Sequence, residues 1–383
     1  MVLTYSHDIA TPTESEHKHY VMAIACGNEE TNYSHMKDKT AVIKAKPRLA
    51  FVGAGWIGLN RMKSLIGSGL CEAAAIVDPV QEHVSQAREL APEITSFLTL
   101  DEVIESRPDG IIIATPSALH AAQCIQALDK GIPVFCQKPL ARTSAESRSV
   151  IAAAQKSDCL LGVDLSYRFT DGMQRIYELV HTGKLGKIFA VDLVFHNAYG
   201  PDKAWFYDPA LSGGGCLIDL GIHLVDLALW VLDFPGATHV SSSLMARGKP
   251  LSDPQKETED YVSSQFTTSQ GASVRLACSW NLPAGNNAEI RAFFYGTQAA
   301  AGFRNVNGSF YDFEMVLCQG TSSEVLIRPP DDWGGKALRE WTIKLAENRS
   351  FNPEINTYLQ VAETIDRIYG RLNIEDIRPQ KID

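Results

Sequence analysis

The chain of 383 residues lacks several features that would place it in a specialised class of protein. Its eight cysteines form no Cys-x-x-Cys pair, so neither a zinc ribbon nor a disulfide framework is predicted, and a reducing, cytoplasmic setting is expected. The longest apolar stretches are interrupted by charges or show helical periodicity, so no membrane span is predicted. Acidic residues outnumber basic ones by 45 to 35, and the net charge of −10 disfavours nucleic acid or an anionic membrane as partner. A globular protein that acts on small molecules is expected.

Internal repeats, low-complexity segments and sets of metal ligands at usable spacing are also lacking, so no metal site is predicted. Residues 1–46 contain no arginine and no apolar core, which argues against a transit peptide and a secretory signal. We expect a polar, mobile extension there, with translation starting at Met1 or Met36. The length predicts more than one domain, and the pattern divides the rest into residues 47–166, residues 167–350, and a C-terminal helix and tail, 351–383.

A glycine-rich segment follows the first strand-like run, Leu49–Val52, with the spacing Gly-x-Gly-x-x-Gly. In this pattern the glycines permit a tight turn, a close approach to a pyrophosphate, and close packing of the following helix. Asp78 ends the next buried strand, where a carboxylate accepts the ribose hydroxyls of NAD and repels the phosphate of NADP. The segment therefore predicts a dinucleotide site, and a glycine-rich turn without ligand is the alternative. Its cofactor-binding residues would be Gly53, Gly55, Trp56, Ile57 and Gly58.

Strands and helices alternate regularly up to about residue 166, which predicts a parallel sheet covered on both faces, with ligands at the carboxyl ends of its strands. Beyond Tyr167 the apolar residues alternate with period two, as in 189–195, 274–280 and 290–294. The expected fold class is α/β: an N-terminal Rossmann domain followed by an α/β domain with a large, mostly antiparallel, open-faced sheet. The open face could meet solvent, substrate or a second subunit.

Two clusters lie where strands of the predicted parallel sheet end, ATPSALH at 114–120 and YRF at 167–169. Both would lie beside the cofactor groove, because the carboxyl ends of parallel strands meet at one edge. Packing in the first helical turn is the alternative for the histidine. The candidate contacts to cofactor or substrate are Thr115, Pro116, His120, Tyr167 and Arg168.

A third cluster, CQKPLA, follows the strand 133–136 and places Gln137 and Lys138 where the nicotinamide end of a cofactor should arrive. An ammonium group at that position stabilises a developing alkoxide and lowers the pKa of an alcohol. A solvated lysine before a turn is the alternative.

The segment 212–230 carries Asp219, His223 and Asp226 at helical spacing, so the three are expected on one stripe of a helix. Histidine titrates near neutral pH, so His223 suits removal of a hydroxyl proton, with Asp219 orienting the ring. Gly213 to Gly215 would let the start of this helix approach a neighbouring backbone closely. A metal site on this stripe, or a structural helix with a satisfied histidine, are the alternatives.

Together these motifs resemble the glucose-fructose oxidoreductase, inositol dehydrogenase and MocA family over residues 48–371. The resemblance implies a Rossmann domain followed by an open-faced α/β domain, and an oligomer formed through the open sheet. It also implies that Lys138, Asp219 and His223 form the catalytic set. Gln137 stands where the family has glutamate, which puts a secondary contact in doubt rather than the catalytic lysine.

We therefore expect an NAD(H)-dependent oxidoreductase that transfers hydride between nicotinamide and a secondary alcohol or ketone of a sugar, sugar derivative or cyclic polyol. The loop 198–209 supplies aromatic and polar groups for the sugar, including Trp205. A redox-neutral NAD-dependent glycoside hydrolase or lyase, and a non-catalytic regulator that binds dinucleotide and sugar, are the alternatives. The expected substrate-binding residues are Lys138, Tyr167, Trp205, Asp219 and His223.

Overall fold

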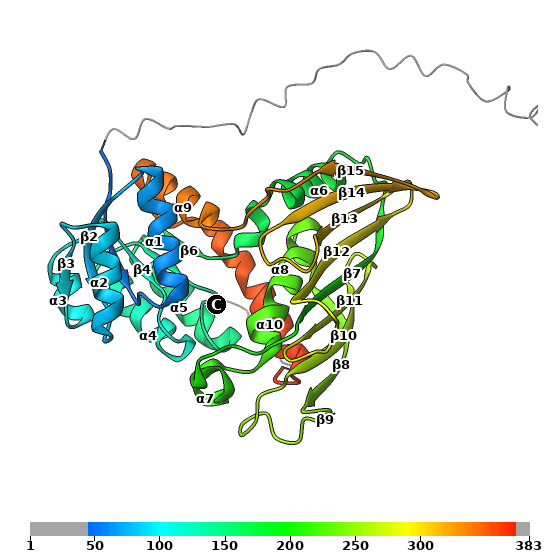
Figure 1. Cartoon of the computed structure of the whole chain (residues 1–383), viewed down its shortest axis with the longest axis horizontal. Coiled ribbons are helices and arrows are strands. Elements are labelled where there is room, and N and C mark those ends of the chain that lie inside the picture. The colour runs from blue at the N-terminus through cyan, green and yellow to red at the C-terminus, as the bar shows by residue number, and fades with distance from the viewer. Residues whose placement is uncertain (1–44, 373–383) are drawn as a thin grey trace, which may run out of the picture. The chain divides into compact units, whose positions relative to one another are not determined.

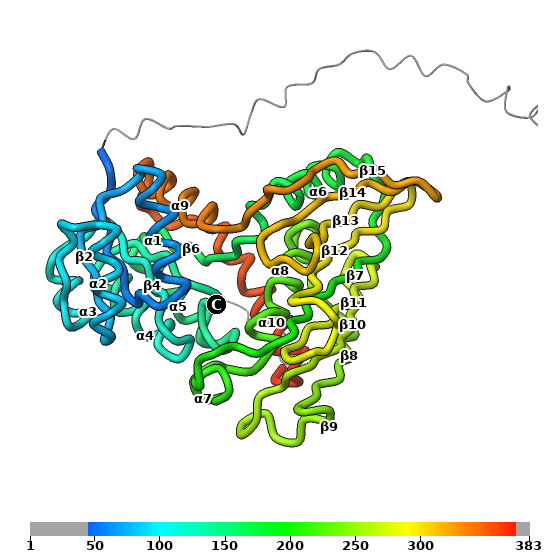
Figure 2. Tube along the Cα trace, viewed as in Figure 1, coloured from blue at the N-terminus to red at the C-terminus, as the bar shows by residue number. Residues whose placement is uncertain are grey.

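The computed structural model of the chain describes residues 45–372 (Figures 1 and 2). Almost all of the expected N-terminal extension, including the alternative start at Met36, and the tail after residue 372 lie outside the described residues. Figure 1 shows a parallel sheet with helices on its faces at the left and a larger sheet, backed by helices, at the right.

Six parallel strands form the first sheet, in the order β3-β2-β1-β4-β5-β6, which confirms the predicted Rossmann sheet. The strand order reverses between β1 and β4, and the carboxyl ends of strands leave a crevice for a ligand at such a point. The strands are β1 (Arg48–Val52), β2 (Glu72–Val77), β3 (Thr95–Phe97), β4 (Gly110–Ile113), β5 (Val134–Cys136) and β6 (Leu161–Val163). The helices are α1 (Trp56–Ser68), α2 (Gln81–Leu90), α3 (Leu100–Glu105), α4 (Ser117–Leu128) and α5 (Ser144–Lys156).

A later helix, α9 (Lys336–Glu347), also packs on this first sheet. Its Trp341 ring lies 5.7 Å from that of Phe135. Gly110 and Gly162 leave space for the indole, since a Cβ atom on either would lie within 2.7 Å of it. The sequence-based division at residue 350 grouped this helix with the second domain, because the order of elements does not reveal which sheet an apolar helix face covers.

Nine strands form the second sheet, in the order β15-β14-β13-β12-β7-β11-β10-β8-β9. Only β7 and β11 run parallel among these described pairs, which confirms the predicted mostly antiparallel sheet. The strands are β7 (Ile188–Asn197), β8 (Ala237–Ala246), β9 (Lys249–Pro250), β10 (Tyr261–Thr268), β11 (Ser273–Ser279), β12 (Ala288–Gly296), β13 (Ala300–Asn305), β14 (Phe313–Gln319) and β15 (Ser322–Ile327).

Helices cover one face of this sheet and leave the other face uncovered (Figure 1). Ile290, Ala292 and Phe294 of β12 lie in the core on the covered face, so Arg291 and Phe293 point to the opposite face. The helices of this domain are α6 (Asp171–His181), α7 (Pro209–Ser212), α8 (Ile222–Val231) and α10 (Tyr358–Ile368). Short 3₁₀ turns are η1 (Ser166–Phe169), η2 (Ala204–Tyr207) and η4 (Pro353–Thr357), and η3 (Leu217–Gly221) is a π-helical turn.

The helical stretch Pro209–Val231 corrects the expectation that no apolar stretch reaches membrane-spanning length. It has 23 residues and a mean hydropathy of 1.6, and within residues 45–372 it is the one helical stretch that is both long and apolar enough. Of its most apolar window, 89% is buried inside the protein. Packing in the core of the second domain accounts for this apolar character.

Candidate functional site

The glycine-rich loop between β1 and α1 has the backbone geometry of a phosphate-binding turn. Gly53 adopts a φ of +90°, and a Cβ atom there would lie 2.6 Å from the backbone of Ala114. A Cβ atom on Gly58 would collide with the carbonyl oxygen of Gly53, whereas one on Gly55 would meet nothing within 4 Å. The first and third glycines are thus required by packing, and the space above the second is open to a ligand.

The start of helix α1 suits an anion. No side chain caps its N-terminus, and its first turn contains no acidic residue, so the free N–H groups and the helix dipole favour a phosphate. Trp56, 63% exposed, and the half-buried Ile57 occupy the first two positions. The start of this helix is therefore compatible with a bound pyrophosphate, and the contacts of these residues to NAD stay a prediction.

Asp78 follows β2 and holds the shape of the glycine-rich loop. Its Oδ2 accepts a hydrogen bond from the N–H of Ala54 at 2.6 Å, and its Oδ1 accepts one from the N–H of Val80 at 2.9 Å. The ring of His83 lies 3.0 Å from the same Oδ1. His83 lies in the first turn of α2, and no sequence motif indicated this neighbour of Asp78.

Lys138 and Asp219, from different domains, form an ion pair. The Lys138 Nζ donates to the Asp219 Oδ1 at 2.8 Å and to its backbone oxygen at 2.7 Å. The Asp219 Oδ2 accepts from the indole N–H of Trp280 at 3.1 Å. Both members of the pair remain partly exposed, at 20% and 16% of their side chains. The structure thus brings together two residues of the predicted catalytic set that lie 81 positions apart.

A π-helical turn, η3, carries Asp219 and changes its predicted relation to His223. The N–H of Ile222 bonds to the carbonyl of Leu217, five residues back, so the α-helical stripe counted from the sequence is interrupted here. Asp219 bonds to Lys138 and Trp280 rather than to His223. The expectation that Asp219 orients the imidazole is therefore not met.

His223 is the second residue of helix α8. Its ring is enclosed and lies near two positively charged side chains. It is 8% exposed and makes no hydrogen bond to another residue of the described chain. Burial, with the nearby charges of Lys138 and Arg61, lowers the pKa of His223 well below its usual value. The imidazole is therefore neutral at neutral pH, which is the form that can accept a proton.

Tyr167 lies against His223, with ring centroids 5.0 Å apart and an edge-to-face arrangement. It is 5% exposed, and burial raises the pKa of its hydroxyl. Arg61 opposes this rise, whereas Asp219 and Tyr311 add to it, so these groups surround the phenol. Tyr167 therefore lies beside one member of the predicted catalytic set, and its hydroxyl stays protonated at neutral pH.

The side chain of Gln137 is buried and bonds within the first domain. Its Nε2 donates to the Asp164 Oδ2 at 2.6 Å, and the fully buried Arg61 donates to the same oxygen at 2.6 Å. The amide of Gln137 thus donates a hydrogen bond to the Asp164 carboxylate. A glutamate at position 137 would instead place a second negative charge beside Asp164. This network corrects the predicted cofactor contact, and neither Arg61 nor Asp164 was singled out from the sequence.

The side chain of Arg168 pairs with a residue of the second domain. Its guanidinium forms a two-point ion pair with the buried Asp226 of α8, with the Nε atom 2.8 Å from Oδ2. It also lies 5.2 Å from the ring centre of Phe234. A buried carboxylate without a partner is costly, so this pair explains both charges as structural and corrects the predicted cofactor role.

His120 is 1% exposed and links two loops of the first domain. Its Nδ1 lies 2.7 Å from the carbonyl oxygen of Pro139, and its Nε2 lies 2.7 Å from that of Thr115. The predicted cofactor contact is replaced by this supporting role. Thr115 donates its hydroxyl to Gln123 at 2.6 Å, while Pro116 precedes helix α4, and both remain partly exposed at the crevice.

The loop before Asp219 is held by a buried carboxylate. Glu259, 1% exposed, accepts hydrogen bonds from the N–H groups of Gly215 and Leu217, at 3.0 Å and 2.9 Å. The hydroxyl of Tyr369 donates to it at 2.7 Å. A Cβ atom on Gly215 would collide with the backbone of Glu259, which agrees with the predicted close approach of the glycines to a neighbouring backbone.

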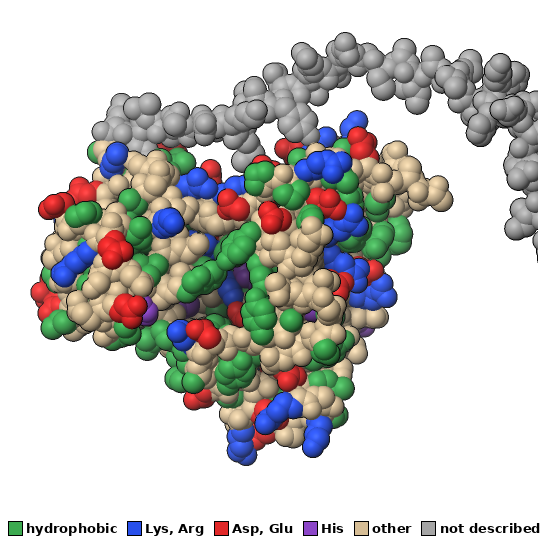
Figure 3. Space-filling model, in the orientation of Figure 1, with side chains coloured by type: hydrophobic (Ala, Val, Ile, Leu, Met, Phe, Trp, Pro, Cys, Tyr) green, Lys and Arg blue, Asp and Glu red, His purple; other side chains and the backbone are tan. Residues whose placement is uncertain are grey.

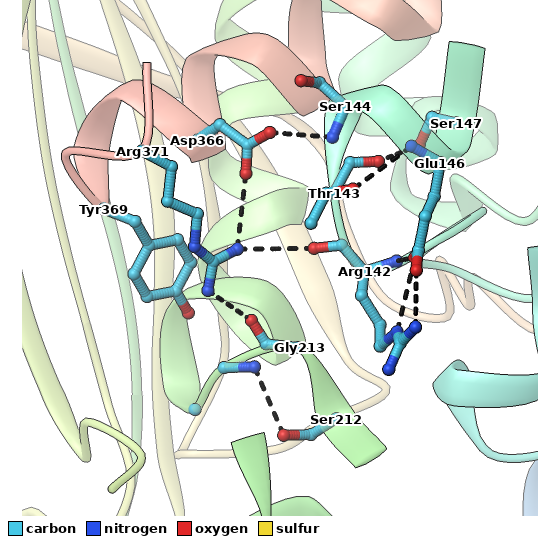
Figure 4. Close-up of polar contacts among 12 residues, drawn as sticks. Arg142, Thr143, Ser144, Glu146, Ser147, Ser212, Gly213, Asp366, Tyr369 and Arg371 are labelled. Carbon is cyan, nitrogen blue, oxygen red and sulfur yellow. Dashed lines mark hydrogen bonds and ion pairs between the residues drawn. The ribbon is translucent and has the colours of Figure 1, made fainter. Parts of the chain in front are cut away.

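Arg371 joins the two loops that carry the reactive residues (Figure 4). Its guanidinium donates to the carbonyl of Gly213 at 2.6 Å and to that of Arg142 at 3.4 Å, and it pairs with Asp366 at 3.3 Å. Arg142 follows the loop of Lys138, and Gly213 precedes η3. Arg371, which follows α10, thus links the segment after Lys138 to the segment before η3.

A hollow opens between the two domains on the face drawn in Figure 3. Figure 3 shows this hollow edged by hydrophobic side chains, with basic and histidine side chains inside it. Within residues 45–372, no group of three His, Cys, Asp or Glu side chains is arranged to hold a metal ion. Trp205 lies beside the hollow in η2, stacked on Phe206 at 3.8 Å, and Phe206 lies edge-on to Trp280 at 6.3 Å.

Comparison with known proteins agrees with this geometry. The profile described as "Oxidoreductase family, NAD-binding Rossmann fold" matches residues 47–165, and the "GFO/IDH/MocA C-terminal domain" matches residues 173–301. D-glucoside 3-dehydrogenase of Escherichia coli is 30% identical over 214 residues, which are 53% of this chain and 59% of that protein. The scyllo-inositol 2-dehydrogenase (NAD(+)) of Bacillus subtilis is 27% identical over 261 residues, 66% of this chain and 72% of that protein.

Solved structures share the fold at lower sequence identity. Levoglucosan dehydrogenase in complex with NADH and levoglucosan superposes with a TM-score of 0.73 at 20% identity, covering 85% of this chain and 97% of that one. Aldose-aldose oxidoreductase from Caulobacter crescentus gives 0.70 at 23% identity, with coverage of 85% and 97%. The alignments to D-glucoside 3-dehydrogenase and to the rhizopine catabolism protein MocA of Rhizobium meliloti span 59% and 56% of those proteins. The chain belongs to the GFO/IDH/MocA oxidoreductase family.

Proposed function

We propose that the protein is an NAD(H)-dependent dehydrogenase that oxidises a secondary alcohol of a sugar, sugar derivative or cyclic polyol, or reduces the corresponding ketone. The observation that carries this proposal is the Lys138–Asp219 ion pair beside a neutral, enclosed His223. A cation that can hold an alkoxide oxygen and a base that can take its proton lie together where the first domain presents a dinucleotide.

In the oxidative direction, the ammonium of Lys138 binds the substrate oxygen and lowers the pKa of the hydroxyl. The neutral imidazole of His223 accepts the hydroxyl proton as the carbonyl forms. Bound NAD supplies the acceptor for the hydride that leaves the same carbon. Asp219 holds the lysine, and the indole of Trp280 holds the carboxylate of Asp219 from its other side.

The glycine-rich loop would hold the pyrophosphate, with contacts from the partly exposed Thr115 and Pro116, and Asp78 would hold the adenosine ribose. The charge of Asp78 favours NAD over NADP. The seven cysteines within residues 45–372 are free thiols, which suits a reducing, cytoplasmic setting.

We also propose that the uncovered face of the second sheet joins two copies of the chain. Apolar Phe293 and Tyr295, stacked at 6.2 Å, lie on this face beside Arg291 and an Asp192–Arg275 ion pair. Aromatic residues and arginine are enriched in protein–protein interfaces, and a symmetric contact would pair this face with itself.

The test is the absorbance of reduced nicotinamide while the protein and NAD are supplied with sugars, inositols and glycosides in turn. One substrate class should raise it, and Lys138→Met and His223→Gln should each lower kcat more than about a hundredfold. Lys130→Met and His181→Gln, which change exposed residues elsewhere, are the matched controls. Near-normal rates in the two site variants would refute the assignment. Glycoside cleavage without net reduction would indicate a redox-neutral enzyme, and ligand binding without turnover a regulator.

A further inference from the structure

Two series of aromatic side chains lead outward from Asp219 and His223, and each series ends at an exposed tyrosine. A first series leads outward from Asp219. The indole N–H of Trp280 donates to the Asp219 carboxylate, and the Trp280 ring contacts that of Tyr207. The Tyr207 ring lies edge-on to Trp280 at 5.5 Å and is 45% exposed, whereas Trp280 is buried. Asp219 also contributes to the raised pKa of the Tyr207 hydroxyl, after burial, so this tyrosine lies within reach of the site.

A second series leads outward from His223. Its ring meets Tyr167 at 5.0 Å, and Tyr167 meets Trp333 at 5.9 Å. Trp333 in turn stacks on Tyr311, with ring centroids 5.9 Å apart and planes 9° apart. The inner ring of this series is buried, and the outer ring, Tyr311, is 48% exposed.

Two neighbouring loops carry the outer rings. Residues 198–208 follow β7 and carry Tyr207, and residues 306–312 join β13 to β14 and carry Tyr311. The Tyr199 ring of the first loop lies 5.9 Å from the Phe310 ring of the second, so the two loops contact each other. Large aromatic side chains that are half exposed add little to the core, and a concave site lined by them is typical of ligand binding.

The charges of these loops restrict the ligand. Within the two described loops the one cation, Lys203, is paired with Asp202 at 3.2 Å. A phosphate or other anionic group would find no free positive partner here, whereas a neutral ring can stack on an aromatic face. Tyr207 lies one aromatic ring further from Asp219 than Trp280 does. Tyr311 likewise lies one ring further from His223 than Trp333 does. A single sugar held at Lys138 would therefore leave the outer tyrosines unused.

We propose that the substrate carries a second, uncharged ring beyond the oxidised sugar, as in an aryl glycoside or a disaccharide, and that Tyr207 and Tyr311 stack on this ring. The inference rests on the proposed function, because the first ring must be held at Lys138 and His223. It names the part of the substrate that the second domain selects.

The experiment compares methyl glucoside, phenyl glucoside and cellobiose, which share one glucose ring. An aromatic contact contributes about 0.5–1.5 kcal/mol, equivalent to about a twofold to tenfold effect. We therefore expect kcat/KM for at least one two-ring compound to exceed that for methyl glucoside about tenfold. Tyr207→Ala and Tyr311→Ala should each lower this ratio about threefold or more. Phe189→Ala, an equally exposed aromatic at the opposite end of β7, should leave the ratio unchanged.

The outcomes separate this inference from the proposed function. A gain with phenyl glucoside alone identifies an aryl group as the second ring, and a gain with cellobiose alone identifies a second sugar. Equal kcat/KM for all three compounds, or a ratio that neither tyrosine substitution changes, overturns the inference while the dehydrogenase stands. If none is oxidised, calorimetry with the NADH-bound protein decides: tighter binding of a two-ring compound that is lost in Tyr311→Ala supports the inference, and equal binding overturns it.

Discussion

Burial and two cations act in the same direction on His223. Desolvation disfavours the charged imidazolium, and the charges of Lys138 and Arg61 disfavour it further, so the pKa lies well below the usual histidine value. A base must be unprotonated to accept a proton. The neutral form therefore persists as the pH falls from neutrality and is lost only when the pH passes below this lowered pKa.

We expect alcohol oxidation to continue undiminished through the pH range in which an ordinary histidine becomes protonated, and to decline only below it. Lys138→Met removes one of the two cations, so the pKa of His223 should rise in that variant. Titration of the histidine ring signals by NMR, with His223→Gln to assign the signal, measures both values. A His223 pKa at or above the usual value, or one that does not rise in Lys138→Met, would contradict this account.

The candidate residues differ in how far the sequence could place them. Lys138, Asp219 and His223 were identifiable because each follows a motif with a chemical purpose. The orientation of two other candidates was not predictable: Gln137, next to Lys138, and Arg168, in the YRF cluster, bond to the carboxylates of Asp164 and Asp226. A charge or amide at the end of a strand can face the crevice or the core, and only its spatial neighbours decide which.

At the scale of one element, helix α1 and the glycine-rich loop before it show what the sequence predicts and what only the structure explains. The motif spacing predicted the roles of all three glycines, and the structure gives a packing reason for two of them and open space above Gly55. By contrast, the π-helical turn η3 left no signal in the apolar periodicity. It therefore displaced the expected stripe of Asp219 and His223.

Gly55→Ala tests the open space directly. The backbone of Gly55 has a φ of −62°, and its added methyl group would meet nothing within 4 Å, so the free energy of unfolding should change little. The same methyl group would obstruct a pyrophosphate, so we expect the Kd for NAD to rise about tenfold or more. Thermal unfolding and calorimetric titration with NAD measure the two effects.

Gly67→Ala is the matched control, because Gly67 lies in the last turn of the same helix and the added methyl group also meets nothing within 4 Å. This substitution should raise the free energy of unfolding by about 0.5–1 kcal/mol and leave NAD binding unchanged. NAD binding by Gly55→Ala with wild-type affinity would rule out this loop as the phosphate site.

For the whole molecule, the uncovered face of the nine-stranded sheet predicts an assembly. If two copies meet there, a charge placed on that face should separate them, because an unpaired carboxylate buried in an interface is costly. We therefore expect Phe293→Asp to shift the protein to a smaller species in sedimentation equilibrium. Leu98→Asp, which changes an 89% exposed residue of the first domain, should not. A wild-type protein that sediments as a monomer at micromolar concentration would contradict the proposed assembly.

Local patterns were sufficient to predict the two sheets and the dinucleotide motif and to nominate candidate reactive side chains, because hydrophobic periodicity and turn chemistry act over neighbouring residues. They were not sufficient for the Lys138–Asp219 ion pair, for the return of α9 to the first sheet, or for the aromatic series that ends at Tyr311. Each of these depends on groups far apart in the chain, whose meeting is decided by the packing of whole elements. The positions of the chemical groups along the chain were therefore readable in advance, whereas the partners that set their charge and accessibility were decided by the tertiary structure.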